Sequence, residues 1–575
     1  MKPMSTHRRS PGVELADPFW APRLEQLAST TLPVLLHRLE DHGVVAAFDG
    51  DAVRRGLWFS DSDLYKWMEA AARARRLDLL EPIVAVVADA QHPDGYLNSY
   101  YDRGPGSPGR YVDLANSHEW YCGGHLIEAA LAHHDATGER TLLDVAVRWA
   151  DHLCSTFGPG GDERIDGHPE VELALVHLSR ATGDPRYLAM ARWIIERTVD
   201  LSSVDLAGHA VRAIYLASAI AEVAISTGDG VYTAAATKLW RTMVDERSYP
   251  TGAVGGRWLG ESVGRPFELG DDTSYTESCA AVAAMQFAWR MWMLTESTSC
   301  LDHMELILYN AVAAGVGSDG ETWFYSQPHA YSGDGESNPW ASPYDFSASM
   351  MLSWFPPKRH GWFDVTCCPT NLVRAFAGIP SMVADVEGSH LRIHLPIACR
   401  IIDGEWDVEV VGRYPWDGSI EFIAHSTPVD GRIAVRVPSW AGGKGHRDIT
   451  VTPRLDLPVR PEWWETDPRV SAARGSAFLR GGPIVYCVEG AADAGYDLRA
   501  VVVQLGQALE ERDAPMLAGG VRVVGFRGRS LPTEGGLYRR LGSGGPPTGD
   551  VELTAIPYAA NSNRRFGQMT VNLRH

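Results

Sequence analysis

The sequence lacks the long apolar runs that mark proteins held in a membrane. No stretch of about eighteen apolar residues occurs among the 575 residues, so no membrane-spanning helix is expected. The first ten residues, Met1 to Ser10, also lack the apolar segment of a secretory signal peptide. We therefore expect an intracellular, cytoplasmic protein.

Cysteine and positive charge are both scarce. Eight cysteines, most of them isolated, do not make the pattern of a disulfide framework in a chain of this length. The 52 Lys and Arg residues are outnumbered by 72 Asp and Glu residues, which gives a formal net charge of −20. This charge disfavours nucleic acids and anionic membranes as partners, but it does not disfavour a neutral substrate.

What the chain does contain is typical of a multidomain globular protein. Apolar residues make up 45% and charged residues 22% of the sequence, as in ordinary folded domains. Because 575 residues exceed what one hydrophobic core supports, two or three domains are expected.

Up to residue 385, apolar residues recur at helical spacing. The spacing predicts about twelve helices, over residues 21–41, 61–75, 78–91, 119–136, 140–157, 169–182, 185–199, 208–227, 230–246, 274–296, 299–314 and 369–385. A Thr-Gly-acidic motif recurs every 45 residues, at 137–139, 182–184 and 227–229. Gly is typical of a helix end and an acidic residue of a helix start, so each repeat predicts a helical hairpin. Twelve helices in hairpins favour an (α/α)6 barrel over an open solenoid, which stays the alternative because no pattern proves ring closure.

Beyond residue 386 apolar and polar residues alternate, as in strands with one buried face. Turn residues separate these runs at short intervals, which predicts one or two β-sandwiches that support the helices. The expected division is an extended lead-in over 1–20 that could add a strand to a sandwich, an (α/α)6 barrel over 21–385, a first sandwich over 386–490 and a second over 491–575.

Two adjacent cysteines, Cys367 and Cys368, stand near the predicted start of the last helix. Neighbouring cysteines rarely bond to each other, because the ring they would close is strained, and a soft metal ion is a more natural partner for two thiolates. About ninety residues earlier, Glu277 and Cys279 supply a carboxylate and a third thiol. The four side chains predict a zinc site with three sulfur ligands and one oxygen ligand. The alternative is that the cysteines are small buried apolar residues.

Histidines recur where predicted helices begin. His118, His168 and His209 stand at equivalent places in successive hairpins, and His125 follows His118 by two turns. A single histidine at a helix start is more often a cap or a core residue. Three at equivalent places favour a ligand-binding ring at one mouth of the barrel.

Three acidic residues also attract attention. Glu261 lies in a Gly-rich, irregular segment and is a candidate free carboxyl group, although an exposed loop glutamate is the commoner interpretation. Glu305 lies within an apolar helix, where an unpaired carboxylate is costly to bury, so we expect it to face a polar cavity. Asp272 is expected to cap the helix that follows it.

Several short motifs occur in a fixed order along the chain. They are Asp61-Ser62-Asp63-Leu64-Tyr65-Lys66-Trp67, Asp94-Gly95-Tyr96-Leu97-Asn98, Gly124-His125-Leu126-Ile127-Glu128, Gly260-Glu261, Tyr275-Thr276-Glu277-Ser278-Cys279, Leu308-Tyr309-Asn310, Cys367-Cys368-Pro369 and Ile556-Pro557-Tyr558. Between about Asp17 and about Gln568 the chain resembles glycoside hydrolase family 127, the zinc-dependent β-L-arabinofuranosidases. The resemblance implies an (α/α)6 catalytic barrel followed by β-sandwiches, which agrees with the patterns above.

The resemblance also implies roles for single residues. It implies Zn²⁺ bound by Glu277, Cys279, Cys367 and Cys368, with Cys367 as the nucleophile and Glu261 as the general acid/base. The sugar-binding positions of the family map onto His118, His168, His209, Glu305 and Tyr325, with His125 as the alternative to His118. A homodimer is implied by the resemblance alone. Iron is the alternative metal, because thiolate-rich sites accept both ions.

The expected function is that of a retaining exo-glycosidase acting on terminal β-L-arabinofuranosides of small carbohydrates, by double displacement with sulfur as the nucleophile. The nearest alternative is the same mechanism on another sugar, such as a branched or acidic deoxypentose. Others are a sugar epimerase on a similar barrel and a non-catalytic carbohydrate-binding protein with a structural zinc. The chain departs from the family pattern at Thr370, Gly270 and residues 326–329. We expect the last two near the sugar pocket, where they would affect the choice of glycoside.

Overall fold

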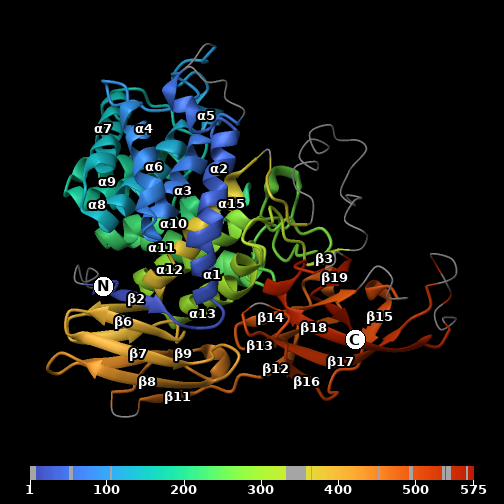
Figure 1. The fold of residues 1–575 in the computed structure, drawn as a ribbon. Coiled ribbons are helices and arrows are strands. Elements are labelled where there is room, and N and C mark those ends of the chain that lie inside the picture. Colours follow the sequence, from blue (N-terminus) through green and yellow to red (C-terminus); the bar gives the residue numbers. More distant parts are fainter. Residues whose placement is uncertain are drawn as a thin grey trace.

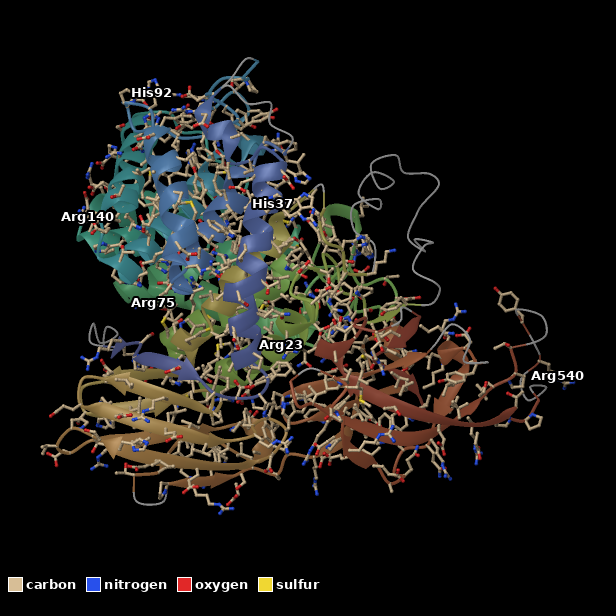
Figure 2. All side chains as sticks on the ribbon, viewed as in Figure 1. Arg23, His37, Arg75, His92, Arg140 and Arg540 are labelled. Atoms are coloured by element: carbon tan, nitrogen blue, oxygen red, sulfur yellow. The ribbon has the colours of Figure 1, made fainter. Side chains whose placement is uncertain are left out.

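The computed structural model describes residues 8–50, 56–103, 106–331, 358–363, 365–450, 453–490, 496–517, 519–533, 538, 540, 545–564 and 567–575. Helices form one part of the molecule, and two groups of strands lie side by side beneath them (Figure 1). Side chains fill the space between the elements (Figure 2), and the buried apolar residues form one continuous core through both parts.

Six helices form the inner wall of the helical part. They are α3 (Asp61–Arg73), α6 (Glu119–Thr137), α8 (Val171–Thr182), α10 (Ala210–Thr227), α12 (Ser278–Thr295) and α15 (Cys367–Ala377). Each contacts the next in this order, and α15 in turn contacts α3. The order of contacts therefore closes on itself, which an open solenoid would not do. Almost every residue of α3 is buried, because an inner helix is covered on all sides.

A second set of helices packs outside the first. It consists of α2 (Leu32–Asp41), α4 (Leu77–Asp89), α7 (Thr141–Thr156), α9 (Pro185–Thr198), α11 (Gly230–Thr242) and α13 (Thr298–Ile307). Each contacts the inner helix next to it in sequence, and each buries one face, as apolar residues at helical spacing require. Every helix predicted from the sequence has a counterpart in these two sets. The prediction over 21–41 covers α1 (Ala21–Gln26), a π-helical turn and α2, and the helix predicted over 369–385 ends earlier, at Ala377.

The repeated turn motif ends three inner helices. Gly138, Gly183 and Gly228 follow α6, α8 and α10 with φ of 76°, 76° and 68°, in the left-handed region that favours glycine. Asp184 and Asp229 then cap the next helices, each accepting a hydrogen bond of 2.9 Å from the backbone N–H two residues later. The first copy differs, because α7 begins after Arg140 and has no side-chain cap.

Two five-stranded sheets include the N-terminal residues. In spatial order the first is β1 (Arg8–Arg9), β4 (Ala384–Glu387), β5 (His390–Ile393), β9 (Arg432–Val437) and β10 (Gly445–Asp448). The second is β11 (Arg454–Asp456), β8 (Ser419–Ser426), β7 (Trp406–Gly412), β6 (Cys399–Asp403) and β2 (Gly12–Leu15). Burial alternates along most of β7, as the alternating sequence predicts. The lead-in thus adds one strand to each sheet.

The third sheet is larger and is built from distant segments. Its main path is β12 (Pro461–Glu465), β13 (Ser476–Gly481), β20 (Leu573–Arg574), β15 (Val501–Val503), β17 (Arg522–Ser530), β18 (Gly549–Pro557), β14 (Ile484–Gly490), β19 (Gln568–Thr570) and β3 (Ala330–Tyr331), and β16 (Glu510–Asp513) pairs with β17. The expected boundary between residues 490 and 491 is wrong, because β12 to β14 pair with strands that follow it. The division between sheets lies instead between β11 and β12.

By length and composition alone, α10 is the one helix of the described residues that could cross a membrane. In the fold, 72% of its apolar stretch is buried, because α10 packs between α8 and α12 in the inner wall. This burial accounts for its composition.

Candidate active site

The starts of the inner helices bring polar side chains to one end of the ring. The short helix α5 (Leu114–Ser117), which leads into α6, lies at the end of the helical part away from the sheets (Figure 1). His118, His209 and Glu277 are the cap residues before α6, α10 and α12, and Cys367 is the first residue of α15. Helix starts carry partial positive charge and unpaired N–H groups, so this end of the ring favours anionic groups.

Glu277, Cys279, Cys367 and Cys368 form a compact cluster, in which one ligand atom from each lies within 4.8 Å of the others. Cys367 Sγ lies 3.7 Å from Glu277 Oε1 and 3.9 Å from Cys368 Sγ. Cys368 Sγ lies 3.5 Å from the same glutamate oxygen. The residues meet although they are far apart in sequence, because α12 and α15 are neighbours in the ring.

Four acidic groups this close cannot all be ionised unless a cation offsets their charge. Burial, and then Cys367, raise the pKa of Glu277, and burial raises the pKa of Cys368. Burial also acts on Cys279, but hydrogen bonds with Cys367 and Cys368 outweigh it and lower the pKa of Cys279 to about 6. Three thiols and one carboxylate are a donor set that divalent zinc accepts. The cluster could therefore hold a metal ion.

Glu261 lies beside this cluster, at the end of a short 3-10 turn, with φ of 49°. Its Oε2 lies 2.8 Å from His209 Nε2, and its Oε1 accepts a hydrogen bond of 2.8 Å from the Tyr275 hydroxyl. The same hydroxyl lies 3.4 Å from Glu277 Oε2. Burial raises the pKa of Glu261, but the hydrogen bond with His209 and the other contacts outweigh burial and lower it. Glu261 is thus held as a carboxylate next to the metal-ligand candidate Glu277.

Three imidazoles lie in a row at the same end of the ring. The His168 ring is 5.1 Å from the His118 ring and 6.0 Å from the His209 ring, centroid to centroid. Burial lowers the pKa of His118 to about 4 and lowers that of His168 well below its usual value. Neutral imidazoles both donate and accept hydrogen bonds, which suits them to the hydroxyl groups of a sugar.

Tyr325 joins this group from the segment between α13 and α15. Its hydroxyl oxygen lies 3.2 Å from Cys367 Sγ. Its carbonyl oxygen accepts a hydrogen bond of 2.8 Å from the Ser278 N–H, and the next residue, Ser326, forms a β-bridge with Glu277. The first turn of α12 therefore fixes the position of Tyr325.

Two family descriptions match the chain. "Beta-L-arabinofuranosidase, GH127 catalytic domain" matches residues 12–381, which is more than half of the sequence, and "Glycoside hydrolase family 127 C-terminal domain" matches residues 461–574. The chain belongs to glycoside hydrolase family 127. It is therefore a glycosidase, and its substrate is a carbohydrate.

Similar proteins span nearly the whole chain. A non-reducing end β-L-arabinofuranosidase of Bifidobacterium longum subsp. longum is 29% identical, over 97% of this chain and 99% of its own. A solved GH127 β-L-arabinofuranosidase from Geobacillus stearothermophilus T6 is 29% identical with a TM-score of 0.85, over 98% of this chain and 99% of its own. A solved GH127 β-arabinofuranosidase is 28% identical with a TM-score of 0.86, over 98% of this chain and 97% of that one.

Glu305 does not join the other candidate sugar-binding residues. It is fully buried in α13, where it accepts a hydrogen bond of 2.6 Å from Tyr414 and lies 2.7 Å from Arg436 of β9. The expectation that it faces a polar cavity is wrong, because Arg436 of β9 and Tyr414, which follows β7, cover it at the contact between helices and sheets.

His118 and His125 occupy different surroundings. His118 lies beside His168 at the mouth of the ring. His125 is fully buried behind Tyr121, whose ring is 4.7 Å away, and its Nδ1 lies 3.6 Å from Glu170 Oε1. Of the two histidines, His118 is therefore the one that belongs to the row of imidazoles.

Among the positions that depart from the family pattern, Ser326 lies next to the cluster through its β-bridge with Glu277, whereas His329 and Gly270 lie away from it, contrary to expectation. His329 is fully buried, with its ring stacked 4.5 Å from Tyr249 and its Nε2 2.7 Å from Thr251 Oγ1. A side chain at Gly270 would collide with the Thr273 hydroxyl and would touch Ala472 at ordinary contact distance. Thr370 is fully buried, with its hydroxyl 3.4 Å from the Thr366 carbonyl oxygen.

Three further residues near the site had no role predicted from the sequence. The Tyr275 hydroxyl donates a hydrogen bond to Glu261. Lys66 is buried in α3. Arg212 Nη2 lies 3.5 Å from His118 Nε2. Lys66 carries a detectable signal, because it follows Asp63 by three residues in a predicted helix, and opposite charges at this spacing can pair. Tyr275 and Arg212 carry none, because both residue types are common near helix starts.

Proposed function

We propose that the protein is a retaining exo-glycosidase that removes terminal β-L-arabinofuranosyl groups, with Cys367 as the nucleophile and Glu261 as the general acid/base. One observation carries this proposal. Glu277 belongs both to the four-ligand cluster and to a second compact group with His209 and Glu261, each group lying within 4.8 Å. The candidate nucleophile and the candidate acid/base are therefore both neighbours of one carboxylate. The activity named for the relatives supports the choice of sugar.

Zinc is the ion we propose for the cluster, held by Glu277, Cys279, Cys367 and Cys368. When bound there, it would keep the thiols ionised at neutral pH and so supply a thiolate nucleophile. The charge balance of the cluster supports this assignment. Burial and close contact oppose ionisation of its acidic groups, and a bound cation would offset their negative charge.

In the first step, Cys367 Sγ attacks the anomeric carbon, and the bond from that carbon to the glycosidic oxygen breaks. Glu261 gives its proton to this oxygen, and the aglycone leaves as an alcohol. In the second step, Glu261 takes a proton from water, whose oxygen attacks the anomeric carbon, and Cys367 leaves as the thiolate. Two displacements at one carbon retain its configuration, and ordinary retaining geometry predicts about 5–5.5 Å between the two catalytic groups.

Glu261 must be protonated before the first step. In the free protein its contact with His209 opposes this by lowering the pKa of Glu261. We infer that the glycosidic oxygen takes the place of His209 next to Glu261 Oε2. With that contact gone, the largest cause that lowers the pKa of Glu261 is removed, and burial, which acts to raise the pKa as a general acid requires, is opposed only by Tyr275 and Arg212.

The sugar would lie against the neutral imidazoles of His118 and His168, with His209 beside the leaving group. Tyr325 would position the nucleophile through its hydroxyl, which lies 3.2 Å from Cys367 Sγ. Glu305 has no direct part in this scheme. The inner and outer helices around this site support an (α/α)6 barrel as the catalytic domain, because the two sets alternate in sequence and the inner set closes on itself.

The test is hydrolysis of 4-nitrophenyl β-L-arabinofuranoside by the reduced, zinc-loaded protein. We expect turnover in the wild type, and a loss of more than about 100-fold in Cys367→Ser and in Glu261→Gln, which is the lower range of acid/base contributions. Cys154→Ser is the matched control, because Cys154 is half-buried like Cys367 but lies in α7, outside the cluster. Undiminished turnover in a zinc-loaded, folded Cys367→Ser variant would exclude the nucleophile.

A second candidate is the same mechanism on an acidic sugar, and Arg212 favours it. Its Nε is buried and has no hydrogen-bond partner among the described residues, and no carboxylate forms an ion pair with it there. A carboxylate on the substrate would satisfy this guanidinium. Hydrolysis of a furanoside with a carboxylate on the sugar, and loss of that activity alone in Arg212→Met, would favour this candidate. Turnover of the neutral arabinofuranoside only would exclude it.

A further inference from the structure

The motif Asp61–Trp67 forms the first two turns of α3 and carries a buried ion pair. Lys66 and Asp63 are both fully buried, and Lys66 Nζ lies 3.1 Å from Asp63 Oδ1. A buried ion pair is costly to form, because both charges lose their hydration. Apolar residues of the same size would pack here at lower cost, so the pair needs a reason other than the stability of α3.

The second oxygen of Asp63 reaches the helix that carries the cysteines. Asp63 Oδ2 accepts a hydrogen bond of 2.6 Å from the Thr366 hydroxyl. Thr366 is the cap residue of α15, and Cys367 and Cys368 follow it directly. The pair in α3 therefore holds the backbone turn from which both cysteines extend.

Lys66 also places a positive charge among groups that become negative. Its ammonium interacts electrostatically with Cys279 and Cys367, and it lies 5.5 Å from the centre of the Tyr121 ring. Three thiolates and Glu277 exceed the charge of one divalent cation by two. A fixed ammonium in a buried setting offsets part of that excess, and water cannot replace it there.

We propose that Lys66, Asp63 and Thr366 are positioning residues for the metal-binding thiolates. Asp63 orients the first turn of α15 through Thr366, and Lys66 holds Asp63 in place and offsets the negative charge of the cluster. This inference rests on the proposed function only in taking the cluster as a zinc site. It gives the Asp61–Trp67 motif a role, and it explains why a charged pair is kept in a fully buried helix.

The test measures zinc affinity by competition with a chelating dye under reducing conditions. Groups next to metal ligands typically contribute 10–100-fold to affinity, so we expect Lys66→Met and Thr366→Val to bind zinc 10–100-fold more weakly than the wild type. Thr366→Ser keeps the hydroxyl and should bind zinc like the wild type. Thr366→Val is close to isosteric, so it tests the contact even if Lys66→Met does not fold.

Arg290→Met is the matched control for a lost buried cation. Arg290 lies in α12, is 8% exposed, and its Nε is 3.2 Å from Glu222 Oε1. The Arg290→Met substitution should lower the melting temperature and leave zinc affinity unchanged. Wild-type zinc affinity in both Lys66→Met and Thr366→Val would overturn the inference and leave the proposed function intact. A wild-type protein that binds no zinc would overturn both.

Discussion

At the scale of single residues, the site depends on how Tyr275 connects two carboxylates. Its hydroxyl donates to Glu261 at 2.8 Å and lies 3.4 Å from Glu277. Neither carboxylate is replaced when this hydroxyl is removed, so its effect can be separated from theirs. Removal of the Tyr275 hydroxyl therefore tests how strongly the protonation state of Glu261 controls the rate of the reaction.

We predict that Tyr275→Phe moves the basic limb of the pH profile of kcat/KM to higher pH. The hydrogen bond from Tyr275 stabilises the carboxylate and contributes to the lowered pKa of Glu261. Its loss raises that pKa, so the protonated acid persists at higher pH. A hydrogen bond to a charged group is worth about 1.5–3 kcal/mol, and the profile should move by about one pH unit or more.

Tyr232→Phe is the control for this prediction. Tyr232 is also buried and donates to a glutamate, Glu196, at 3.0 Å, but both lie on the outer helices α11 and α9. Its pH profile should match that of the wild type. An unmoved profile in Tyr275→Phe would mean that Glu261 does not set the basic limb.

At the scale of helices, ion pairs link neighbours in the ring through their C-terminal halves. His177 of α8 lies 2.7 Å from Glu128 of α6 and 3.2 Å from Glu222 of α10. Arg374 of α15 lies 3.1 Å from Glu69 of α3, the pair of helices that closes the ring. These contacts join helices that the sequence separates, so they stabilise the ring itself.

We predict that His177→Gln lowers the free energy of unfolding by about 3 kcal/mol near pH 6, as expected for a broken buried ion pair. Burial opposes the charged form, but Glu128 and Glu222 outweigh it and raise the pKa of His177 to about 9. Because the folded pKa lies above the unfolded value, the charged histidine stabilises the protein fully below pH 6.5 and loses this effect as the pH rises through 9. Denaturant unfolding at pH 6, 8 and 10 should therefore show a difference from the wild type that shrinks with pH.

His37→Gln is the control, because His37 on α2 pairs with Asp41 but its side chain is 71% exposed (Figure 2). Exposed pairs contribute little, so its stability should stay close to that of the wild type at every pH. A difference for His177→Gln that grows with pH would show that the histidine is neutral in the folded protein.

Helices could be predicted from the sequence because their signals are local. Thr-Gly-Asp at residues 182–184 and 227–229 marks helix ends and starts within three residues, and both turns form as predicted. The helix predicted from residue 274 begins four residues later, at Ser278, and Asp272 is not its cap, although its residue type is typical of one. In the structure the Asp271 carbonyl oxygen instead accepts hydrogen bonds from His329 and Ala330. Glu277 precedes α12, so a contact with a distant segment overrides the local signal.

At the scale of the whole molecule, the sequence predicted the kinds of layer but not how strands are shared among the sheets. The boundary at residue 490 failed, because β14 pairs with β18 and β19, and no local pattern encodes pairing across more than sixty residues. The proximity of the four cluster residues is not encoded locally either. Residue types suggested its four ligands, but only the neighbouring positions of α12 and α15 bring them together. Glu305 was misjudged for a related reason, since its partner Arg436 lies on a strand of the other part.

We predict that Glu305→Gln destabilises the contact between helices and sheets without weakening substrate binding. Arg436 is fully buried and paired with both Glu305 and Asp302, so removal of one carboxylate leaves a poorly compensated charge. Breaking such a pair costs about 3–5 kcal/mol, which a lowered melting temperature would report. At a temperature well below the melting transition, KM should equal that of the wild type, because no part of Glu305 reaches the site. The double variant Glu305→Gln/Arg436→Met should recover part of the lost stability, since the fully buried guanidinium is gone and Asp302, which is 12% exposed, still accepts a hydrogen bond from the Ser439 N–H. A raised KM in the folded single variant would instead return Glu305 to the sugar-binding residues.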